Sequence, residues 1–151
     1  MIESKKNNEN QVFKRIIVPL DGSDVAKKAL HHALAIAKEV ELPLLSVYVI
    51  DLSIYAETMM SDQVSNQMRS ILRNEGESVL NNSKKIGEEN GLIIQTRLLE
   101  GTPSEEIVNF TNKNDLIVMG SKGKSKIKQV FIGSVSENVL HHADCNVMIV
   151  R

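Results

Sequence analysis

Short apolar runs alternate with longer amphipathic stretches along the chain. The runs are rich in β-branched residues and end at turn-forming or charged residues, which is typical of strands. They occupy residues 15–20, 42–50, 92–99, 116–119 and 146–150. Between them, apolar side chains recur at helical spacing over about 24–40, 62–89, 103–112 and 134–142. The pattern therefore predicts the order β-α-β-α-β-α-β-α-β.

Strands that are apolar on both faces and alternate with helices indicate a parallel sheet covered by helices on both sides. Right-handed crossovers leave few ways to wind five such strands. We therefore expect a single-domain, Rossmann-like α/β fold with an open five-stranded sheet in the order 3-2-1-4-5. Residues 1–12 are polar and offer little to bury, so they predict a solvated tail before one domain at 13–151.

The stretch 62–89 predicts a long amphipathic helix. Its apolar face consists of Val64, Met68, Ile71, Leu72, Val79 and Ile86. Gly76 lies inside this stretch and weakens the helix, because glycine has a low helix propensity. Gly91 follows it and predicts its C-terminal cap.

Two capping boxes mark helix starts in the second half of the chain. Thr102 is the expected N-cap of one helix, with Pro103 at the first helical position and Glu105 completing the box. Ser134 and Glu137 have the same spacing at the start of the last helix. A box at Ser134 would satisfy that helix end without any ligand.

Composition and charge restrict the class of protein. Apolar residues make up 42% of the chain, charged residues make up 25%, and the formal net charge is -1. This balance is typical of a globular protein and gives no reason to expect nucleic acid or a membrane as partner. One cysteine, Cys145, forms no intrachain disulfide, and we expect it to be a small core residue. The start of the chain lacks the apolar region of a signal peptide, which favours a cytoplasmic protein.

Topology predicts where a ligand binds. In a sheet of this order, ligands lie at the carboxyl ends of the strands where the winding reverses, here between strands 1 and 4. The loops there are 19–23 and 120–134, and the second contains three glycines and four lysines. Glycines permit close approach of backbone N–H groups, and the following helix start adds a positive dipole end. These features indicate a phosphate cradle, although a glycine- and lysine-rich loop is also a common solvated loop.

Other phosphate and metal motifs do not fit. A Walker A loop ending at 123–125 would need a glycine where Val118 stands. The turn after the first strand lacks a dinucleotide-type glycine pattern and carries a lone Asp21, not the acidic pair of a response-regulator receiver. The pairs His31-His32 and His141-His142 occupy adjacent helical positions about 100° apart, so neither pair chelates a metal.

The loop carries a family signature. The spacing Gly120-x2-Gly123-x9-Gly133-Ser134 matches the nucleotide signature G-2x-G-9x-G-[ST] of ATP-binding universal stress proteins. Residues 17–23, 116–121 and 133–140 also resemble that family, and the similarity covers 13–151. The resemblance implies a fold like that of the adenine nucleotide alpha hydrolases, ATP as ligand, and a homodimer.

The resemblance also implies roles for individual residues. Phosphate contacts fall on Gly120, Gly123, Gly133, Ser134, Val135 and Ser136, and nucleoside contacts fall on Pro19, Asp21, Val49 and Met119. Asp21 is placed near the ribose or Mg²⁺, while the residues alone also allow a role in the turn after the first strand. Lys122 and Lys124 stand where the family often has Arg or His, and Lys124 is included as a phosphate contact because lysine binds phosphate well.

Three functions follow as hypotheses. The first is an ATP-binding stress-response module that acts as a dimer, with at most slow ATP hydrolysis. The second is a dedicated ATPase or phosphotransferase. The first is preferred to the second because the sequence supplies no identifiable base to position water. The third is a nucleotide-independent interaction dimer. Residues 146–150 predict dimerisation in either case, because a short apolar edge strand tends to be paired.

Overall fold

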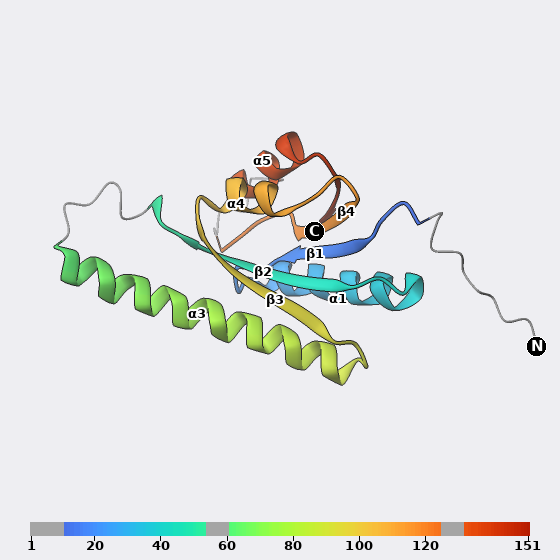
Figure 1. Cartoon of the computed structure of the whole chain (residues 1–151), viewed down its shortest axis with the longest axis horizontal. Helices are drawn as coiled ribbons and strands as arrows, with labels where there is room; N and C mark the ends of the chain where they lie inside the picture. The colour runs from blue at the N-terminus through green and yellow to red at the C-terminus, as the bar shows by residue number, and fades with distance from the viewer. Residues whose placement is uncertain (1–10, 54–60, 125–131) are drawn as a thin grey trace, which may run out of the picture.

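The computed structural model describes residues 11–53, 61–124 and 132–151 (Figure 1). In this part of the chain, strands and helices alternate as predicted. The elements are β1 (Arg15–Pro19), α1 (Asp24–Val40), β2 (Leu44–Asp51), α3 (Asp62–Glu89), β3 (Ile94–Gly101), α4 (Pro103–Phe110), β4 (Asp115–Gly120), α5 (Ser134–His142) and β5 (Asn146–Val150).

The strands form one parallel five-stranded sheet in the order β3-β2-β1-β4-β5. This confirms the predicted fold. Helices α1 and α3 cover one face of the sheet, and α4 and α5 cover the other (Figure 1). No helix among the described residues combines the length and apolar character that crossing a bilayer requires.

Alternating residues of the central strands β1 and β4 belong to two separate hydrophobic cores, one on each face of the sheet. On the first face, Ile16 and Val18 pack against α1, whose alanines allow the helix to lie close to the sheet. On the second face, Ile17 packs with Ile107 of α4 and Val139 of α5. The two central strands are therefore buried on both sides, as their uninterrupted apolar runs predict.

A buried ion pair joins the starts of the two central strands. Arg15 donates from Nε to Asp115 Oδ1 at 2.7 Å and from an Nη to Oδ2 at 3.0 Å. Asp115 is almost fully buried, and it also accepts from the backbone N–H of Asn112 at 2.7 Å. Arg15 further donates to the carbonyl of Phe110 at 3.2 Å. These bonds turn the chain from α4 into β4, so α4 ends at Phe110 and not near residue 112 as predicted.

The ends of α3 follow its sequence signals. Ser61 caps the start, since its side chain accepts from the N–H of Val64 at 3.4 Å. At the other end Gly91 has φ +74°, which confirms its predicted role as the left-handed residue after the helix. The N–H of Leu92 reaches the carbonyl of Gly87 at 2.9 Å, so the helix closes in a Schellman motif.

The predicted apolar face of α3 is only half buried. Val64, Met68 and Ile71 are 42%, 37% and 60% exposed, so their predicted place on a buried face is wrong. The reason is length: α3 has 28 residues and spans about 42 Å, whereas β2 and β3 have eight residues and span about 26 Å. The first turns of α3 therefore extend past the sheet (Figure 1).

The capping box at α4 does not form. Thr102 is the N-cap and Pro103 lies at the first helical position, as predicted, but the Thr102 side chain makes no capping bond. Glu106, and not Glu105, lies against Gly101, where a Cβ atom would be 2.6 Å from Glu106 Oε1. The helix start therefore depends on proline geometry and on the Thr102 carbonyl, which accepts from the N–H of Glu106 at 2.9 Å.

Gly76 is one of two glycines at which α3 presses on the sheet, the other being Gly87 against Ile94. A Cβ atom on Gly76 would lie 2.7 Å from Tyr48 Cδ1 and 2.8 Å from Leu98 Cδ1. We therefore predict that Gly76→Ala lowers the free energy of unfolding by about 1–3 kcal/mol through overpacking, although alanine normally favours a helix. Urea unfolding, with the exposed Asn74→Ala as control, measures this. A stabilised Gly76→Ala protein would contradict the close contact.

Candidate functional site

The two loops at the winding reversal enclose a cavity of about 510 Å³. It extends from the end of β2, across the end of β1, to the end of β4 and the start of α5. All eleven residues that the sequence singled out line it: Pro19, Asp21, Val49, Met119, Gly120, Gly123, Lys124, Gly133, Ser134, Val135 and Ser136. The structure thus brings the candidate residues together, while their contacts with a ligand stay predictions.

Gly120 serves the packing of the fold. A Cβ atom on Gly120 would lie 2.8 Å from Val25 Cγ1 and 3.2 Å from the backbone nitrogen of Ala26. The end of β4 therefore touches the first turn of α1. Ser136 Oγ donates to the Gly120 carbonyl at 2.7 Å and ties the same point to α5. Gly120 is thus needed for close helix–strand contact, whatever the cavity holds.

Asp21 uses its two carboxylate oxygens differently. Oδ1 accepts from the N–H of Ser23 at 2.9 Å, which is the turn role that its position after β1 allows. Ser23 in turn caps α1 by accepting from the N–H of Ala26 at 3.2 Å. Oδ2 faces Gly123, where a Cβ atom would lie only 2.7 Å away. Asp21 therefore holds the turn and also presents a carboxylate oxygen at the loop after β4.

The start of α5 differs from the prediction by one residue. Gly133 is the N-cap, and no side chain caps this helix end, so the predicted box of Ser134 and Glu137 is wrong. The Gly133 carbonyl accepts from the N–H of Glu137 at 2.9 Å, which places Ser134 inside the first turn. The Ser134 side chain makes no capping bond from this position, so the first N–H groups of α5 have no side-chain partner. Residues 134–136 line the cavity with the positive end of a helix dipole.

Sequence reasoning missed the wall that α3 and β2 contribute. Tyr48, Leu72 and Glu75 line the cavity, and Glu75 Oε1 forms an ion pair with Lys124 Nζ. The pair joins residues 49 positions apart, on an element that the family signature does not include. The one local signal is Gly76, whose presence in mid-helix marks the close approach of this turn to Tyr48.

Two groups at this wall have shifted pKa values. Burial raises the pKa of the Tyr48 phenol, the charge of Glu75 raises it further, Lys124 lowers it, and Asp21 adds a smaller rise. The hydrogen bond with Glu75 raises the pKa of Lys124, so Lys124 is a cation throughout the physiological range. Tyr48, Glu75, Lys124 and Asp21 therefore form one electrostatic cluster at the cavity.

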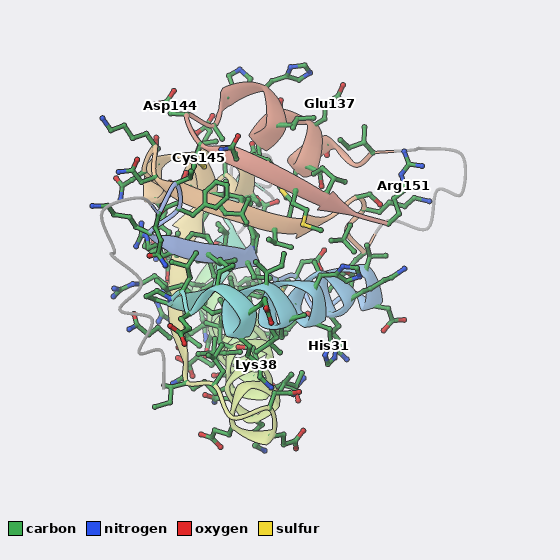
Figure 2. The ribbon with its side chains drawn as sticks, turned by 90° about the vertical axis from the view of Figure 1, so that its right-hand side faces the viewer. His31, Lys38, Glu137, Asp144, Cys145 and Arg151 are labelled. Carbon is green, nitrogen blue, oxygen red and sulfur yellow. The ribbon has the colours of Figure 1, made fainter. Side chains whose placement is uncertain are left out.

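The other lysines, possible metal ligands and Cys145 complete the account of the sequence candidates. Lys122 lines the cavity, while the lysines at 126 and 128 lie outside the described residues. Across 11–53, 61–124 and 132–151, no group of three or more His, Cys, Asp or Glu side chains is placed to hold a metal ion. Cys145 packs beside the second core at the start of β5, and burial raises the pKa of its thiol (Figure 2).

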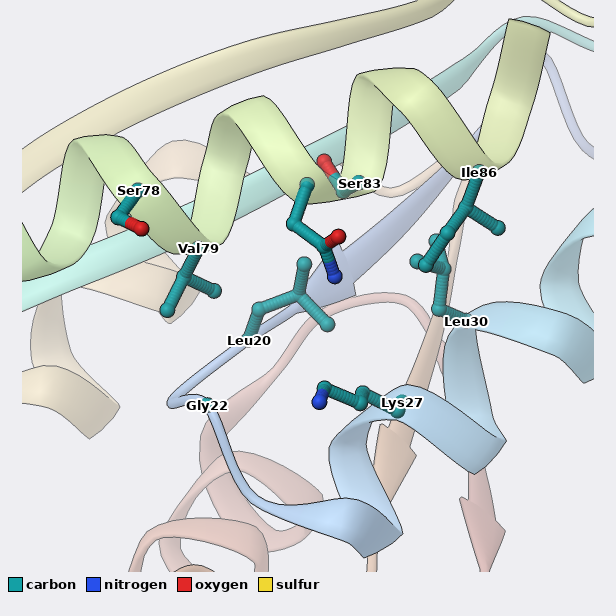
Figure 3. Close-up of a pocket in the computed structure, with 9 residues that line it drawn as sticks. Leu20, Gly22, Lys27, Leu30, Ser78, Val79, Ser83 and Ile86 are labelled. Atoms are coloured by element: carbon teal, nitrogen blue, oxygen red, sulfur yellow. The ribbon is translucent and has the colours of Figure 1, made fainter. Parts of the chain in front are cut away.

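A second, smaller cavity of about 330 Å³ lies between α1 and α3 (Figure 3). Leu20 and Gly22 line one end, and Lys27 reaches toward it from α1. Its walls are otherwise the apolar and polar side chains of the two facing helices. None of the residues lining it comes from the loop after β4 or from α5, so this cavity is not the candidate site.

The Tyr48 phenol can report on the charge cluster. Because Glu75 raises its pKa and Lys124 lowers it, we predict that Glu75→Gln lowers the Tyr48 pKa and Lys124→Gln raises it. Phenolate absorbance measures this in a Tyr55→Phe background, which leaves Tyr48 as the remaining tyrosine. The raised pKa also means that Tyr48 stabilises the fold below the pKa of an unfolded tyrosine, and that this stability is lost as the pH rises through the folded pKa. Equal pKa values in the two variants would contradict the cluster.

Comparison with known proteins places the chain in a family. The sequence model of the Universal stress protein family matches residues 13–151. Universal stress protein MJ0531 of Methanocaldococcus jannaschii is 40% identical over 97% of this chain and 86% of its own length. Universal stress protein YxiE of Bacillus subtilis is 34% identical over 93% of this chain and all of its own length. The solved UspA structure from Lactobacillus plantarum superposes with a TM-score of 0.80, at 26% identity over 92% of this chain and 98% of that one. The chain therefore belongs to the universal stress protein family.

Proposed function

We propose that this protein is an ATP-binding regulatory module of the stress response that acts in the cytoplasm as a homodimer, with at most slow hydrolysis of the nucleotide. The observation that carries the proposal is the cavity at the winding reversal. It combines the uncapped start of α5, the glycine loop and the Asp21 carboxylate, all of which the family resemblance implies as contacts of a nucleotide.

The layout of the cavity suits a nucleotide. Its end at β2 is lined by apolar side chains such as Val47 and Ile50, which suit the faces of a purine base. Its end at β4 and α5 offers glycine backbone, lysines and a helix start, which suit phosphates. The end of β1 lies between them because β1 is between β2 and β4 in the sheet. A nucleotide would therefore lie across the strand ends, with its ribose near Pro19 and Asp21.

Asp21 also fits a role with Mg²⁺. Its Oδ2 faces the loop that would hold the phosphates, and carboxylate and phosphate oxygens together are the ligands this ion prefers. A bound Mg²⁺ would neutralise phosphate charge beside the carboxylate. Since the described residues hold no larger cluster of metal ligands, we expect Mg²⁺ to bind with the nucleotide and not before it.

Two structures with the same fold support an adenine nucleotide as the ligand class. One is described as a universal stress protein in complex with cAMP, and the other as the protein from Archaeoglobus fulgidus in complex with dAMP. At 24% and 22% identity they share the fold of this chain. Their ligands have one phosphate, so the preference for ATP rests on the glycine loop and the start of α5.

Gly133 offers a direct test of nucleotide binding. A Cβ atom on Gly133 would lie 3.4 Å from both Lys122 Cα and Ser121 O, which are ordinary contacts, so the fold does not require glycine here. We predict that Gly133→Val stays folded with a slightly lower unfolding midpoint, because valine is a poorer N-cap than glycine. We also predict that it loses ATP binding more than tenfold, because the added methyl groups occupy the phosphate cradle. Calorimetry on nucleotide-free protein measures both the wild type and the variant.

Gly120→Ala is the matched contrast, since its added methyl group meets Val25 and should lower stability. If wild-type protein binds no ATP, the nucleotide-independent dimer replaces this proposal. If Gly133→Val binds ATP as the wild type does, the phosphates lie elsewhere in the cavity.

The edge strand β5 supports the dimer. It pairs with β4 on one side, and it forms the edge of the sheet in Figure 2.

We predict a solution mass of twice 16.8 kDa at micromolar concentration, measured by light scattering. Ile149→Lys should shift the protein to monomer, because a charge at a strand edge opposes pairing. Leu140→Lys on the exposed face of α5 is the control and should stay dimeric. A monomeric wild type would contradict the dimer.

A further inference from the structure

The ion pair of Lys124 and Glu75 connects the phosphate end of the cavity to α3. Lys124 follows Gly123 in the glycine loop, and Glu75 lies on the helix that walls the opposite side. The side chains are 54% and 40% exposed, so water screens the pair. An exposed pair of this kind is weak, and a stronger ligand can exchange with either partner.

Packing fixes where the pair forms. On the α3 side, Gly76 presses against the ring of Tyr48, which holds the neighbouring Glu75 at the rim of the cavity. On the loop side, the Lys124 stem crosses the turn after β1, and a Cβ atom on Gly22 would lie 3.5 Å from Lys124 Cε. The ammonium group therefore lies over the turn that carries Asp21, at the place where a phosphate would enter.

The charges along the cavity make this pair important. Among the described residues that line it, Lys122 and Lys124 are the cations, while Asp21, Asp51 and Glu75 are the anions. The Lys124 ammonium group already forms an ion pair with the Glu75 carboxylate. A polyphosphate that uses Lys124 has to displace the Glu75 carboxylate and then lies near it.

We propose that Glu75 is an internal competitor for Lys124 and sets how strongly the site prefers nucleotides with more phosphates. The inference rests on the proposed nucleotide site. A phosphate chain wins the exchange because it carries more charge and more acceptor oxygens than a carboxylate. Adenosine has no phosphate and leaves the pair intact. Glu75 therefore weakens ATP binding and leaves adenosine binding unchanged, so it reduces the difference between the affinities for ATP and for adenosine.

The alternative role for Glu75 is to position Lys124 for the phosphate. The exposure of both side chains argues against it, because a flexible lysine stem in water is not held in one geometry by a single ion pair. The two roles predict opposite signs. A positioning residue strengthens ATP binding and its loss weakens it, whereas a competitor weakens ATP binding and its loss strengthens it.

Calorimetry with adenosine, AMP and ATP separates these roles. Divalent cations are left out, so that no metal ion masks the phosphate charge. We expect Glu75→Gln to raise the ratio of ATP affinity to adenosine affinity about twofold to fivefold, which corresponds to the strength of an exposed ion pair. Glu77→Gln is the matched control. It removes the same charge from the exposed face of the same helix and should leave the ratio unchanged.

A second background distinguishes competition from simple repulsion. In Lys124→Gln protein, Glu75 has no lysine to compete for. The rise in the ratio of ATP affinity to adenosine affinity caused by Glu75→Gln should therefore be smaller than in the wild-type background. An equal gain in both backgrounds, an unchanged ratio, or a lower ratio in Glu75→Gln would each overturn the competitor role. If wild-type protein binds neither ATP nor adenosine, the proposed nucleotide site itself fails. If wild-type protein binds both ligands but Glu75→Gln does not change the ratio of ATP affinity to adenosine affinity, this inference alone fails.

Discussion

The buried ion pair of Arg15 and Asp115 sets the alignment on which the site depends. The two residues are direct partners in the register of β1 and β4, at the starts of these strands. The Asp115 side chain is buried while that of Arg15 is 25% exposed, so removal of Arg15 would leave a buried carboxylate without its partner, a change that typically costs about 3–5 kcal/mol. Because the strands start together and run in parallel, Pro19 and Gly120 end at the same edge of the sheet. The two loops can then face each other.

A few polar contacts beyond the strand ends hold the two loops in place relative to the sheet. Asp21 holds the turn through Ser23, and Ser23 starts α1. Ser136 ties the start of α5 to the carbonyl of Gly120. Asp21 and Ser136 each use one polar side-chain atom to hold the fold, and both residues also line the cavity. The site is therefore built from the same groups that hold the strand ends in place, and it needs few dedicated side chains.

The fold could be predicted from the sequence because its determinants are local or follow general rules. The strands, the helices and the sheet order come from periodicity and right-handed crossovers. The winding reversal located the cavity, and the glycine signature together with the family resemblance supplied its candidate residues. Features that depend on distances between elements could not be predicted. The exposure of Ile71 follows from the difference in length between α3 and the strands, and the role of Glu75 follows from a contact with Lys124 across 49 positions. The N-cap of α5 shifted by one residue, because a serine and a glutamate at the right spacing do not fix which carbonyl starts the helix.

The charge balance of the cavity bears on what kind of protein this is. Side chains supply similar numbers of cations and anions there, so the proposed attraction for phosphate would depend on backbone N–H groups and on the dipole of α5. Such groups are fixed in place and lose little entropy on binding, but they are partly solvated and weaker than a buried arginine clamp. Glu75 reduces the contribution of Lys124 further. If the proposed nucleotide site is correct, a site of this construction would bind and release the nucleotide as its concentration changes, which suits the proposed regulatory module better than a catalyst that must hold phosphates rigidly in line.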